Sequence, residues 1–233
     1  MKLVLNGILL SKIDYSESSL ILRFFTREEG LVSFLFQGGK KKKGNALFPL
    51  SRAEINCYKR SDSSLSKISS IDISTVQQEL FFDPIRSSIL FFVSELCSTT
   101  IQNEEEDLAL YQFLEQEIDF IHNSKEFTNY PIYFLLEYTK HLGFYPQSCS
   151  NALFFDLEEG EFTVGKPVGH KYISDDSIAV LNSLVNQPPT EILARTISKS
   201  SRKKMLNNLL TYYRFHQAGF KDLKSIEVLE ALF

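Results

Sequence analysis

The stretch Arg52-Ala53-Glu54-Ile55-Asn56-Cys57-Tyr58 has the clearest strand pattern in the chain. Ala53, Ile55 and Cys57 share one parity, and polar residues occupy the positions between them. Because side chains alternate between the two faces of a strand, this pattern predicts a strand with one buried face.

Four further segments before residue 80 have strand character. Polar or glycine-containing turns separate them, among them Asp14 to Ser19 and Glu28-Glu29-Gly30. We expect these strands near residues 3–10, 20–25, 31–36 and 65–73. Five short strands at this spacing suggest a sandwich or a small barrel, and the number five suits an OB-fold. The sequence therefore predicts an N-terminal five-stranded OB-fold β-barrel, a nucleic-acid-binding domain over residues 1–80.

Beyond residue 80 the apolar residues recur at helical spacing. Asp83 and Pro84 suit the cap and the first residue of a helix, and Gly143 with Pro146 suits the end of another. The helical period disappears over residues 147–172, where we expect a β-hairpin insertion. The predicted fold class is α+β, with an α-helical second domain over residues 81–233. Its helices are expected from Pro84 onward and over residues 108–121, 130–142, 175–184, 190–197, 199–216 and 223–232.

The charge of the chain is unevenly distributed. The whole sequence of 233 residues has a net charge of −4, but residues 1–80 hold 12 Lys and Arg against 8 Asp and Glu. The basic part therefore coincides with the predicted barrel, and the rest is acidic. No apolar run approaches the roughly 18 residues of a membrane span, and no secretory signal is evident. The three cysteines are scattered, which argues against a disulfide framework and for a reducing cytosol.

The most concentrated positive charge is the run Lys40-Lys41-Lys42-Lys43, with glycine on both sides. We expect a mobile loop between two strands whose adjacent ammonium groups favour contact with a polyanion. The alternative is a solvated charged loop, which is what most such runs are. Further cations of the same domain extend the predicted DNA-binding track, namely Arg23, Arg27, Lys59, Arg60 and Lys67.

Aromatic side chains of the barrel are candidates either for stacking on bases or for filling the core. These are Phe24, Phe34, Phe36 and Tyr58, and the core is the favoured interpretation.

The sequence gives little support to catalysis. It contains no phosphate-binding loop, dinucleotide fingerprint or HExxH motif, and its four histidines are far apart. The acidic run Glu104 to Asp107 is explained by its place at a helix start. Three isolated cysteines do not complete a structural zinc site. We therefore expect no catalytic residue, no metal and no cofactor.

Several segments, in order along the chain, resemble those of one family. They are Gly7-Ile8-Leu9-Leu10, Asp14-Tyr15-Ser16-Glu17-Ser18, Phe25-Thr26-Arg27-Glu28-Glu29-Gly30, Gln37 to Lys43, Leu47-Phe48-Pro49-Leu50, His141-Leu142-Gly143-Phe144-Tyr145-Pro146 and Tyr212 to Ser225. Together they resemble the bacterial recombination mediator family RecO. The chain departs from that family at Ser19, where an aspartate is frequent. It also lacks the two Cys-x-x-Cys pairs of many members, because only Cys149 remains, so we expect the hairpin at residues 152–164 to hold this region without zinc.

The resemblance implies a non-enzymatic DNA repair protein of the bacterial cytoplasm, associated with the nucleoid. Such a protein binds single- and double-stranded DNA, anneals complementary strands, and helps RecA replace the single-strand-binding protein SSB. Its implied partners are RecR and the acidic C-terminal tail of SSB, and no membrane is implied.

For the acidic tail we expect a cation beside an apolar pocket of the helical domain. The candidates are Lys140, Arg214, Lys221, Tyr138, Tyr213 and Phe220. Two alternatives stay open at this point: a protein-interaction scaffold whose barrel binds no nucleic acid, and an RNA-binding OB-fold accessory factor.

Overall fold

A computed structural model describes residues 2–42, 46–59, 65–74, 81–102 and 104–232. Lys43 and Arg60, two of the predicted DNA-binding residues, lie outside this part. The chain forms two compact units. The first unit comprises Met1–Ser124 and Leu223–Leu232, and the second unit comprises Lys125–Asp222.

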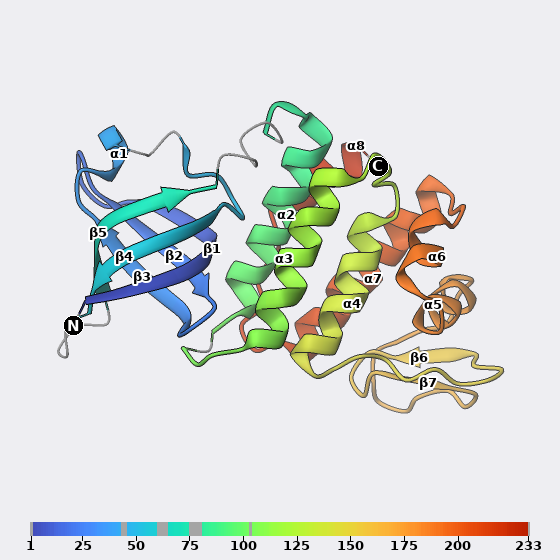
Figure 1. Cartoon of the computed structure of the whole chain (residues 1–233). Helices are drawn as coiled ribbons and strands as arrows, with labels where there is room; N and C mark the ends of the chain where they lie inside the picture. The colour runs from blue at the N-terminus through green and yellow to red at the C-terminus, as the bar shows by residue number, and fades with distance from the viewer. Residues whose placement is uncertain (1, 43–45, 60–64, 75–80, 103, 233) are drawn as a thin grey trace. The chain divides into compact units, whose positions relative to one another are not determined.

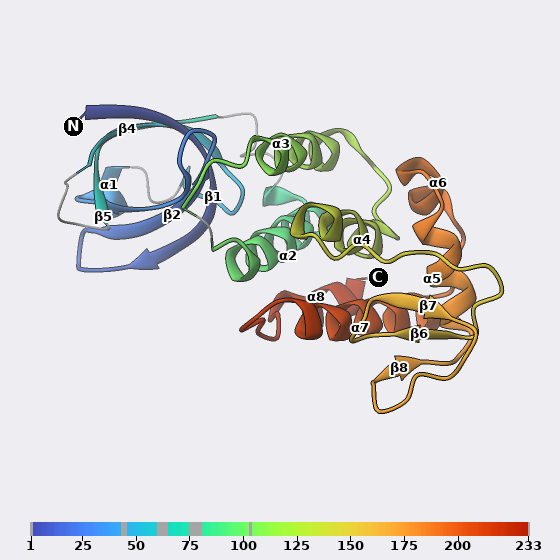
Figure 2. The same cartoon turned by 90° about the horizontal axis from the view of Figure 1, so that it is seen from below.

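The first unit contains a closed five-stranded barrel, as predicted (Figures 1 and 2). Its strands follow the order β1-β2-β3-β5-β4, and the β3–β5 pair is the parallel one. The strands are β1 (Lys2–Asp14), β2 (Leu20–Thr26), β3 (Gly30–Phe36), β4 (Arg52–Tyr58) and β5 (Leu65–Ile73).

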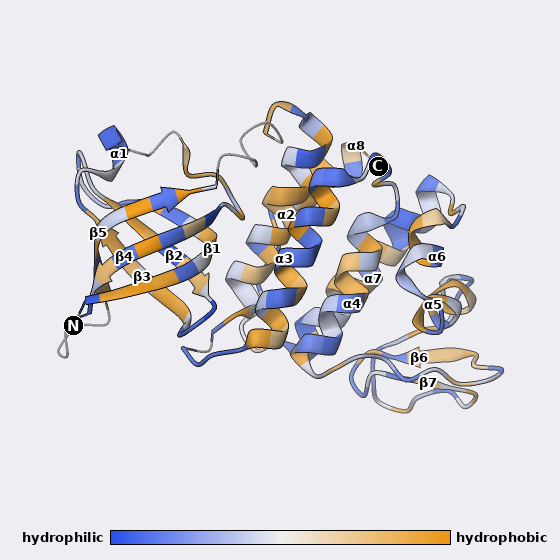
Figure 3. Ribbon diagram, viewed as in Figure 1, coloured by the Kyte–Doolittle hydropathy of each residue, from blue (hydrophilic) through white to orange (hydrophobic). Residues whose placement is uncertain are grey.

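The alternation in the sequence decides what fills the barrel. Ile55 and Cys57 of β4 point inward and are buried, whereas Glu54 and Tyr58 of the same strand are exposed. The same alternation of apolar and polar positions is visible along the strands in Figure 3. The aromatic residues Phe24, Phe34 and Phe36 belong to this core, so they are not available for stacking on bases.

One sector of the barrel is buried on its outer face as well. Ile8 and Leu10 of β1 point away from the barrel interior, yet they are 0% and 3% exposed. The helix α2 (Pro84–Thr100) packs on this sector, and the Ser94 hydroxyl donates to the Leu10 carbonyl at 2.7 Å. The helix α3 (Leu108–Asn123) adds a ring contact between Tyr111 and Phe25 of β2.

The last helix, α8 (Ser225–Leu232), also belongs to the first unit. The Glu95 carboxylate of α2 accepts hydrogen bonds from the backbone N–H groups of Lys224 and Ser225, each at 2.9 Å. The strands end with β5 at Ile73 and the helices begin with α2 at Pro84, whereas the two compact units are divided after Ser124. The reason is that α2 packs on the barrel and that α3 and α8 pack on α2, and a local sequence pattern does not contain such contacts.

A glycine is required in the turn between β2 and β3. Gly30 has φ +63°, and a Cβ atom there would lie 2.1 Å from the carbonyl oxygen of Glu105. The Thr26 hydroxyl donates to the Gly30 carbonyl and accepts from the Glu29 N–H, which closes the turn.

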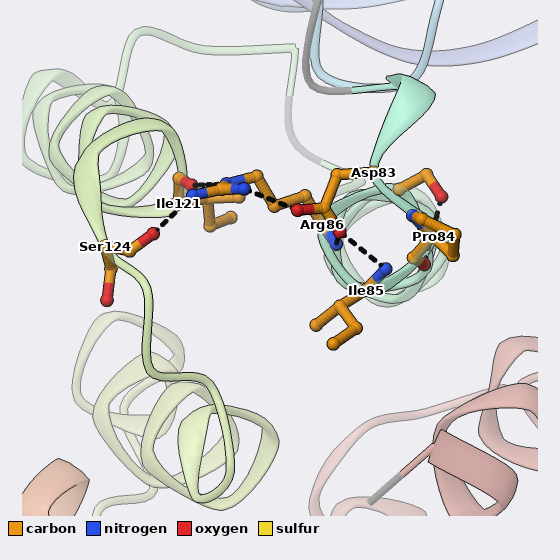
Figure 4. A network of polar contacts seen from close by, with 7 residues as sticks. Asp83, Pro84, Ile85, Arg86, Ile121 and Ser124 are labelled. Atoms are coloured by element: carbon orange, nitrogen blue, oxygen red, sulfur yellow. Dashed lines mark hydrogen bonds and ion pairs between the residues drawn. The ribbon is translucent and has the colours of Figure 1, made fainter.

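The start of α2 is fixed by Asp83 and Arg86 (Figure 4). The Asp83 carboxylate accepts from the N–H groups of Ile85 and Arg86 and pairs with the Arg86 guanidinium. The same guanidinium donates to the carbonyls of Ile121 and Ser124 at the end of α3. One arginine therefore joins the beginning of α2 to the end of α3.

The second unit is mainly helical. The main packed pair is α4 with α7, and the Tyr213 hydroxyl donates to the Leu135 carbonyl across it. Gly143 ends α4 in the left-handed conformation, as its position in the sequence predicts. The helices are α4 (Tyr130–Leu142), α5 (Ser177–Val185), α6 (Pro189–Ala194) and α7 (Lys199–His216). No helix of the described residues is long and apolar enough to cross a membrane.

The expected hairpin insertion is present and carries a third strand that the sequence pattern did not reveal. The sheet has the order β7-β6-β8, built from β6 (Phe154–Asp156), β7 (Glu161–Thr163) and β8 (Tyr172–Ile173). With two residues, β8 is too short to show a period. Asp156 accepts from the N–H groups of Glu158 and Glu159 and contacts His170 Nδ1 at 2.9 Å.

We predict that Asp83→Ala lowers the free energy of unfolding by about 1–2 kcal/mol, since it removes the helix cap. Asp83→Asn keeps an accepting oxygen and is expected to cost less. Burial raises the pKa of Asp83, but the N–H groups of Arg86 and Ile85 and the guanidinium outweigh it, so this pKa lies below its usual 3.8. The part of the Asp83 contribution to the free energy of unfolding that depends on its charge is therefore present above pH 3.8. It is lost as the pH falls through the lowered pKa. Chemical denaturation of the unmodified protein and of both variants, at neutral and at acidic pH, measures the cost of each substitution and its dependence on pH. Equal free energies of unfolding for Asp83→Ala and Asp83→Asn at both pH values would contradict the cap.

We also predict that the insertion is held by a pH-dependent ion pair. The hydrogen bond to Asp156 raises the pKa of His170 above 6.5, against a smaller opposing effect of burial. Burial raises the pKa of Asp156, but His170 and the two N–H groups bring it below 3.8. The contribution of His170 is thus full below pH 6.5 and lost as the pH rises through its raised pKa. The contribution of Asp156 is present above pH 3.8 and is lost as the pH falls through its lowered pKa.

An NMR titration of the imidazole tests the pair. His170 is expected to titrate above 6.5 in the unmodified chain and close to 6.5 in Asp156→Asn. Hydrogen exchange of residues 154–173, compared between these two proteins at each pH, should differ near pH 6 and converge at high pH. An unshifted His170 in the unmodified chain would refute the ion pair.

Candidate nucleic-acid interface

The basic run begins as one turn of helix rather than as the open loop that the sequence suggested. This helix, α1 (Gly39–Lys42), lies beside the β1–β2 turn, where the Lys40 N–H donates to the Ser18 carbonyl at 3.1 Å (Figure 1). Gly39 is seated on the Phe36 ring, and a Cβ atom at this position would lie 2.5 Å from it. The turn is thus fixed to the barrel by a close contact that only glycine allows.

The lysines of α1 differ in their availability. Lys40 pairs with the Asp14 carboxylate at 2.9 Å, so a phosphate would have to compete with that carboxylate. Lys41 and Lys42 are exposed, and within the described residues no ion pair engages them. Lys41 and Lys42 are therefore the two lysines of the described part of the run that a phosphate could approach without competing with a carboxylate.

A row of six side chains crosses the outer face of the barrel; we call it the outer row. Strand pairing places Ile13 beside Ile21, Ile21 beside Leu35, and Leu35 beside Lys67. It then places Lys67 beside Tyr58 and Tyr58 beside Lys2. Paired positions carry their side chains on the same face of a sheet. The outer row is therefore Ile13, Ile21, Leu35, Lys67, Tyr58 and Lys2.

The outer row is accessible to solvent. Ile13 is 55% exposed and Tyr58 is 50% exposed. Lys2 and Lys67 are exposed, and Ile21 and Leu35 are partly exposed. Arg23 lies on the same outer face two residues beyond Ile21, where it is paired with Ser33. The structure thus places one predicted cation, Lys67, next to the exposed ring of Tyr58, and a second, Arg23, on the outside of the non-adjacent strand β2.

The remaining predicted cations of the barrel lie elsewhere. Lys59 pairs with Glu29 at 2.9 Å. Arg27 lines a cavity of about 330 Å³ that also contains Arg52 and three carboxylates, those of Glu54, Asp72 and Glu115. This mixed charge makes the cavity a weaker phosphate site than the outer face.

The candidates for a partner's acidic tail are not assembled into one pocket. Lys140 is held by both oxygens of Glu137 at 2.8 Å and lies over the Tyr145 ring. Tyr138 and Tyr213 are 0% exposed, so neither ring can line a surface pocket as it stands. They are core residues because α4 and α7 pack together there.

Three of those tail candidates remain near one another at the end of α7. Arg214 pairs with Asp222 at 2.6 Å, and Phe220 packs on Tyr213 with ring centroids 5.5 Å apart. Lys221 is exposed beside them.

The structure also shows features that the sequence did not single out. Lys2, Ile13, Ile21 and Leu35 of the outer row were missed, although their outward parity within each strand was a usable signal. An apolar groove of about 700 Å³ in the first unit was missed entirely. It is lined by Leu10 and Lys12 of β1, Phe91 of α2, and Lys224 and Val228 at α8, among others.

The donor set of the insertion does not suit zinc. Cys149 is its one cysteine, and it interacts with Ser150 and Asn182. In the described part of the chain, no three His, Cys, Asp or Glu side chains are grouped so that they could hold a metal ion. That the protein binds no zinc stays a prediction, which a zinc measurement on the purified protein would check.

Comparison with known proteins gives a consistent result over the whole chain. Residues 1–76 match the family model described as "Recombination protein O N terminal", and residues 82–225 match "Recombination protein O C terminal". The DNA repair protein RecO of Flavobacterium psychrophilum is 31% identical over 239 residues, covering 100% of both chains. The protein of the same name from Phocaeicola vulgatus is 30% identical over 97% of both chains.

Proposed function

The chain belongs to the recombination protein O family, whose relatives are named DNA repair proteins, and from this premise we propose that it is a recombination mediator. It binds single- and double-stranded DNA, anneals complementary strands, and with RecR helps to load RecA onto single strands coated by SSB. It acts in the bacterial cytoplasm at the nucleoid, by binding rather than by catalysis.

The observation that carries the DNA-binding part is the pair of exposed lysines on α1. Lys41 and Lys42 are adjacent, and no described carboxylate engages them. Arg23 and Lys67 add positive charge on the outer face of the same barrel. Cations gathered on one domain favour a polyanion even when the net charge of the chain is negative.

Annealing follows from the same charges. Two complementary strands repel each other through their phosphates, and bound cations reduce this repulsion. A protein that holds one strand through phosphate contacts on α1 and leaves most of its bases accessible lowers the barrier to pairing with a second strand.

The assignment of the protein partners rests on family membership alone. RecR and RecA have no assigned surface here. For the acidic SSB tail we keep the surface of Arg214, Phe220 and Lys221 as the candidate, because it combines a cation with a partly exposed ring.

Charge reversal of Arg214 and Lys221 is expected to weaken binding of the tail peptide. Unchanged binding of the peptide would refute the assignment of the tail to this surface.

The DNA-binding proposal is tested by Lys41→Ala/Lys42→Ala. We expect weaker binding to labelled single-stranded DNA and a shallower dependence on salt. The slope of log K against log salt should fall by about 0.7 for each lysine that contacts phosphate. The control is Lys203→Ala/Lys204→Ala, an adjacent and exposed pair on α7 in the second unit, in which Lys204 pairs with Asp175 at 2.9 Å. Thermal unfolding checks that both double variants are folded. A loss in the control as large as in the α1 variant, or no loss in either, would refute the assignment to α1.

Competition with RNA of the same sequence measures the preference for DNA. Equal competition by RNA would favour an RNA-binding accessory role instead. If the unmodified protein binds neither nucleic acid at low salt, the barrel belongs to a protein-interaction scaffold.

A further inference from the structure

We propose that the outer row is a stacking platform for the bases of unpaired DNA, and that Tyr58 is the residue by which the protein distinguishes a single strand from a duplex. This inference rests on the proposed DNA-binding function and adds a specificity-determining residue to it. The lysines of α1 would contact phosphate in either form of DNA, and Tyr58 would contact bases.

The position of Tyr58 supports this role. It is the last residue of β4 and points outward, because its neighbour Cys57 is fully buried in the barrel core. Strand pairing places Lys2 on one side of the ring and Lys67 on the other. Side chains at paired positions lie about 5 Å apart, so both ammonium groups can reach the phosphates that flank a base stacked on the ring.

The aliphatic part of the row extends the same surface. Ile13, Ile21 and Leu35 continue from Lys67 over three more paired strand positions. Elsewhere on the outer face of the barrel, Ile8 and Leu10 are buried under a helix, whereas Ile13 is more than half exposed. A row of at least partly exposed side chains with several apolar members, on the outside of the barrel, is a surface open to a ligand.

The charges around the row favour a negatively charged nucleic acid as the ligand over a protein whose contacting surface is basic or uncharged. The row itself contains Lys2 and Lys67 and no carboxylate. The outward positions two residues away are Ser11, Arg23, Ser33 and Leu65 on one side and Val4 and Asn56 on the other, which add a third cation and no carboxylate. The carboxylates at the ends of the row are both paired with lysines, Asp14 with Lys40 and Glu29 with Lys59. A row whose own charged members are both lysines, with apolar side chains and a ring between and beside them, fits a ligand that combines flat apolar rings with negative charge, which is the chemistry of a single strand.

A duplex cannot use this surface in the same way. Its bases are stacked on one another inside the helix, and its backbone presents phosphates and sugars to the protein. The ring of Tyr58 can therefore stack only on a base that is unpaired. Removing the ring should lower affinity for single strands and leave affinity for duplex DNA unchanged.

The absence of tryptophan from the chain allows a direct test. Tyr58→Trp places the sole tryptophan of the protein on the outer row. Its fluorescence is expected to be quenched by an oligothymidylate, and not by an abasic strand of equal length or by a duplex. Phe91→Trp is the matched control, since Phe91 is 53% exposed on α2 of the same unit and lies outside the row. This control should not respond to any of the three ligands.

Affinity measurements complete the test. Tyr58→Ala is expected to weaken binding of oligothymidylate by about 5- to 150-fold, the range for loss of one base–aromatic stack. Tyr58→Phe keeps the ring and should bind as the unmodified protein does. Binding of duplex DNA and of the abasic strand should be equal in all three proteins. Thermal unfolding confirms that each variant is folded.

The outcomes separate this inference from the proposed function. If oligothymidylate binds, as seen by anisotropy, but leaves the Tyr58→Trp fluorescence unchanged, the stacking platform is wrong while DNA binding stands. The same holds if Tyr58→Ala weakens single-strand and duplex binding equally. If the unmodified protein binds no DNA, the proposed function fails. Concentration-dependent self-association that Tyr58→Ala abolishes, with DNA binding unchanged, would assign the row to a second copy of the chain instead.

Discussion

The burial of β1 on both of its faces is the constraint on which the first unit depends. The inward residues of β1, such as Leu5 and Leu9, fill the barrel, and the outward residues Ile8 and Leu10 are buried as well, on the strand against which α2 packs. Burying these side chains removes apolar surface from water on both sides of a single strand. This packing joins the barrel to α2, and it also determines which part of the barrel wall is left for a ligand.

The exposed part of the wall follows from how the barrel closes. Neighbouring strands of a closed barrel are staggered, so one row of paired positions passes over all five strands. The outer row starts at Ile13 near the end of β1 and returns to Lys2 at its beginning. The row therefore runs around the barrel, and Lys67, Tyr58 and Lys2 are consecutive members of it on three neighbouring strands.

The two units use different means to hold their irregular parts. In the first unit, Arg86 joins the ends of two helices through backbone carbonyls, and Glu95 caps a third helix. In the second unit, the insertion is organised around Asp156, which accepts from two N–H groups and pairs with His170. In each case, one charged side chain satisfies backbone groups that would otherwise lack partners, which is costly away from water.

The sequence by itself determined the strands of the barrel, the long helices and the hairpin, because each depends on local periodicity, caps and turn residues. It also placed the basic run beside the barrel. Only the tertiary structure decided that Lys40 is paired with Asp14, that Tyr138 and Tyr213 are buried, and that α8 belongs to the first unit. The outer row belongs to this second group as well. Its members come from five strands, and the register that aligns them is a set of long-range hydrogen bonds that no local pattern contains.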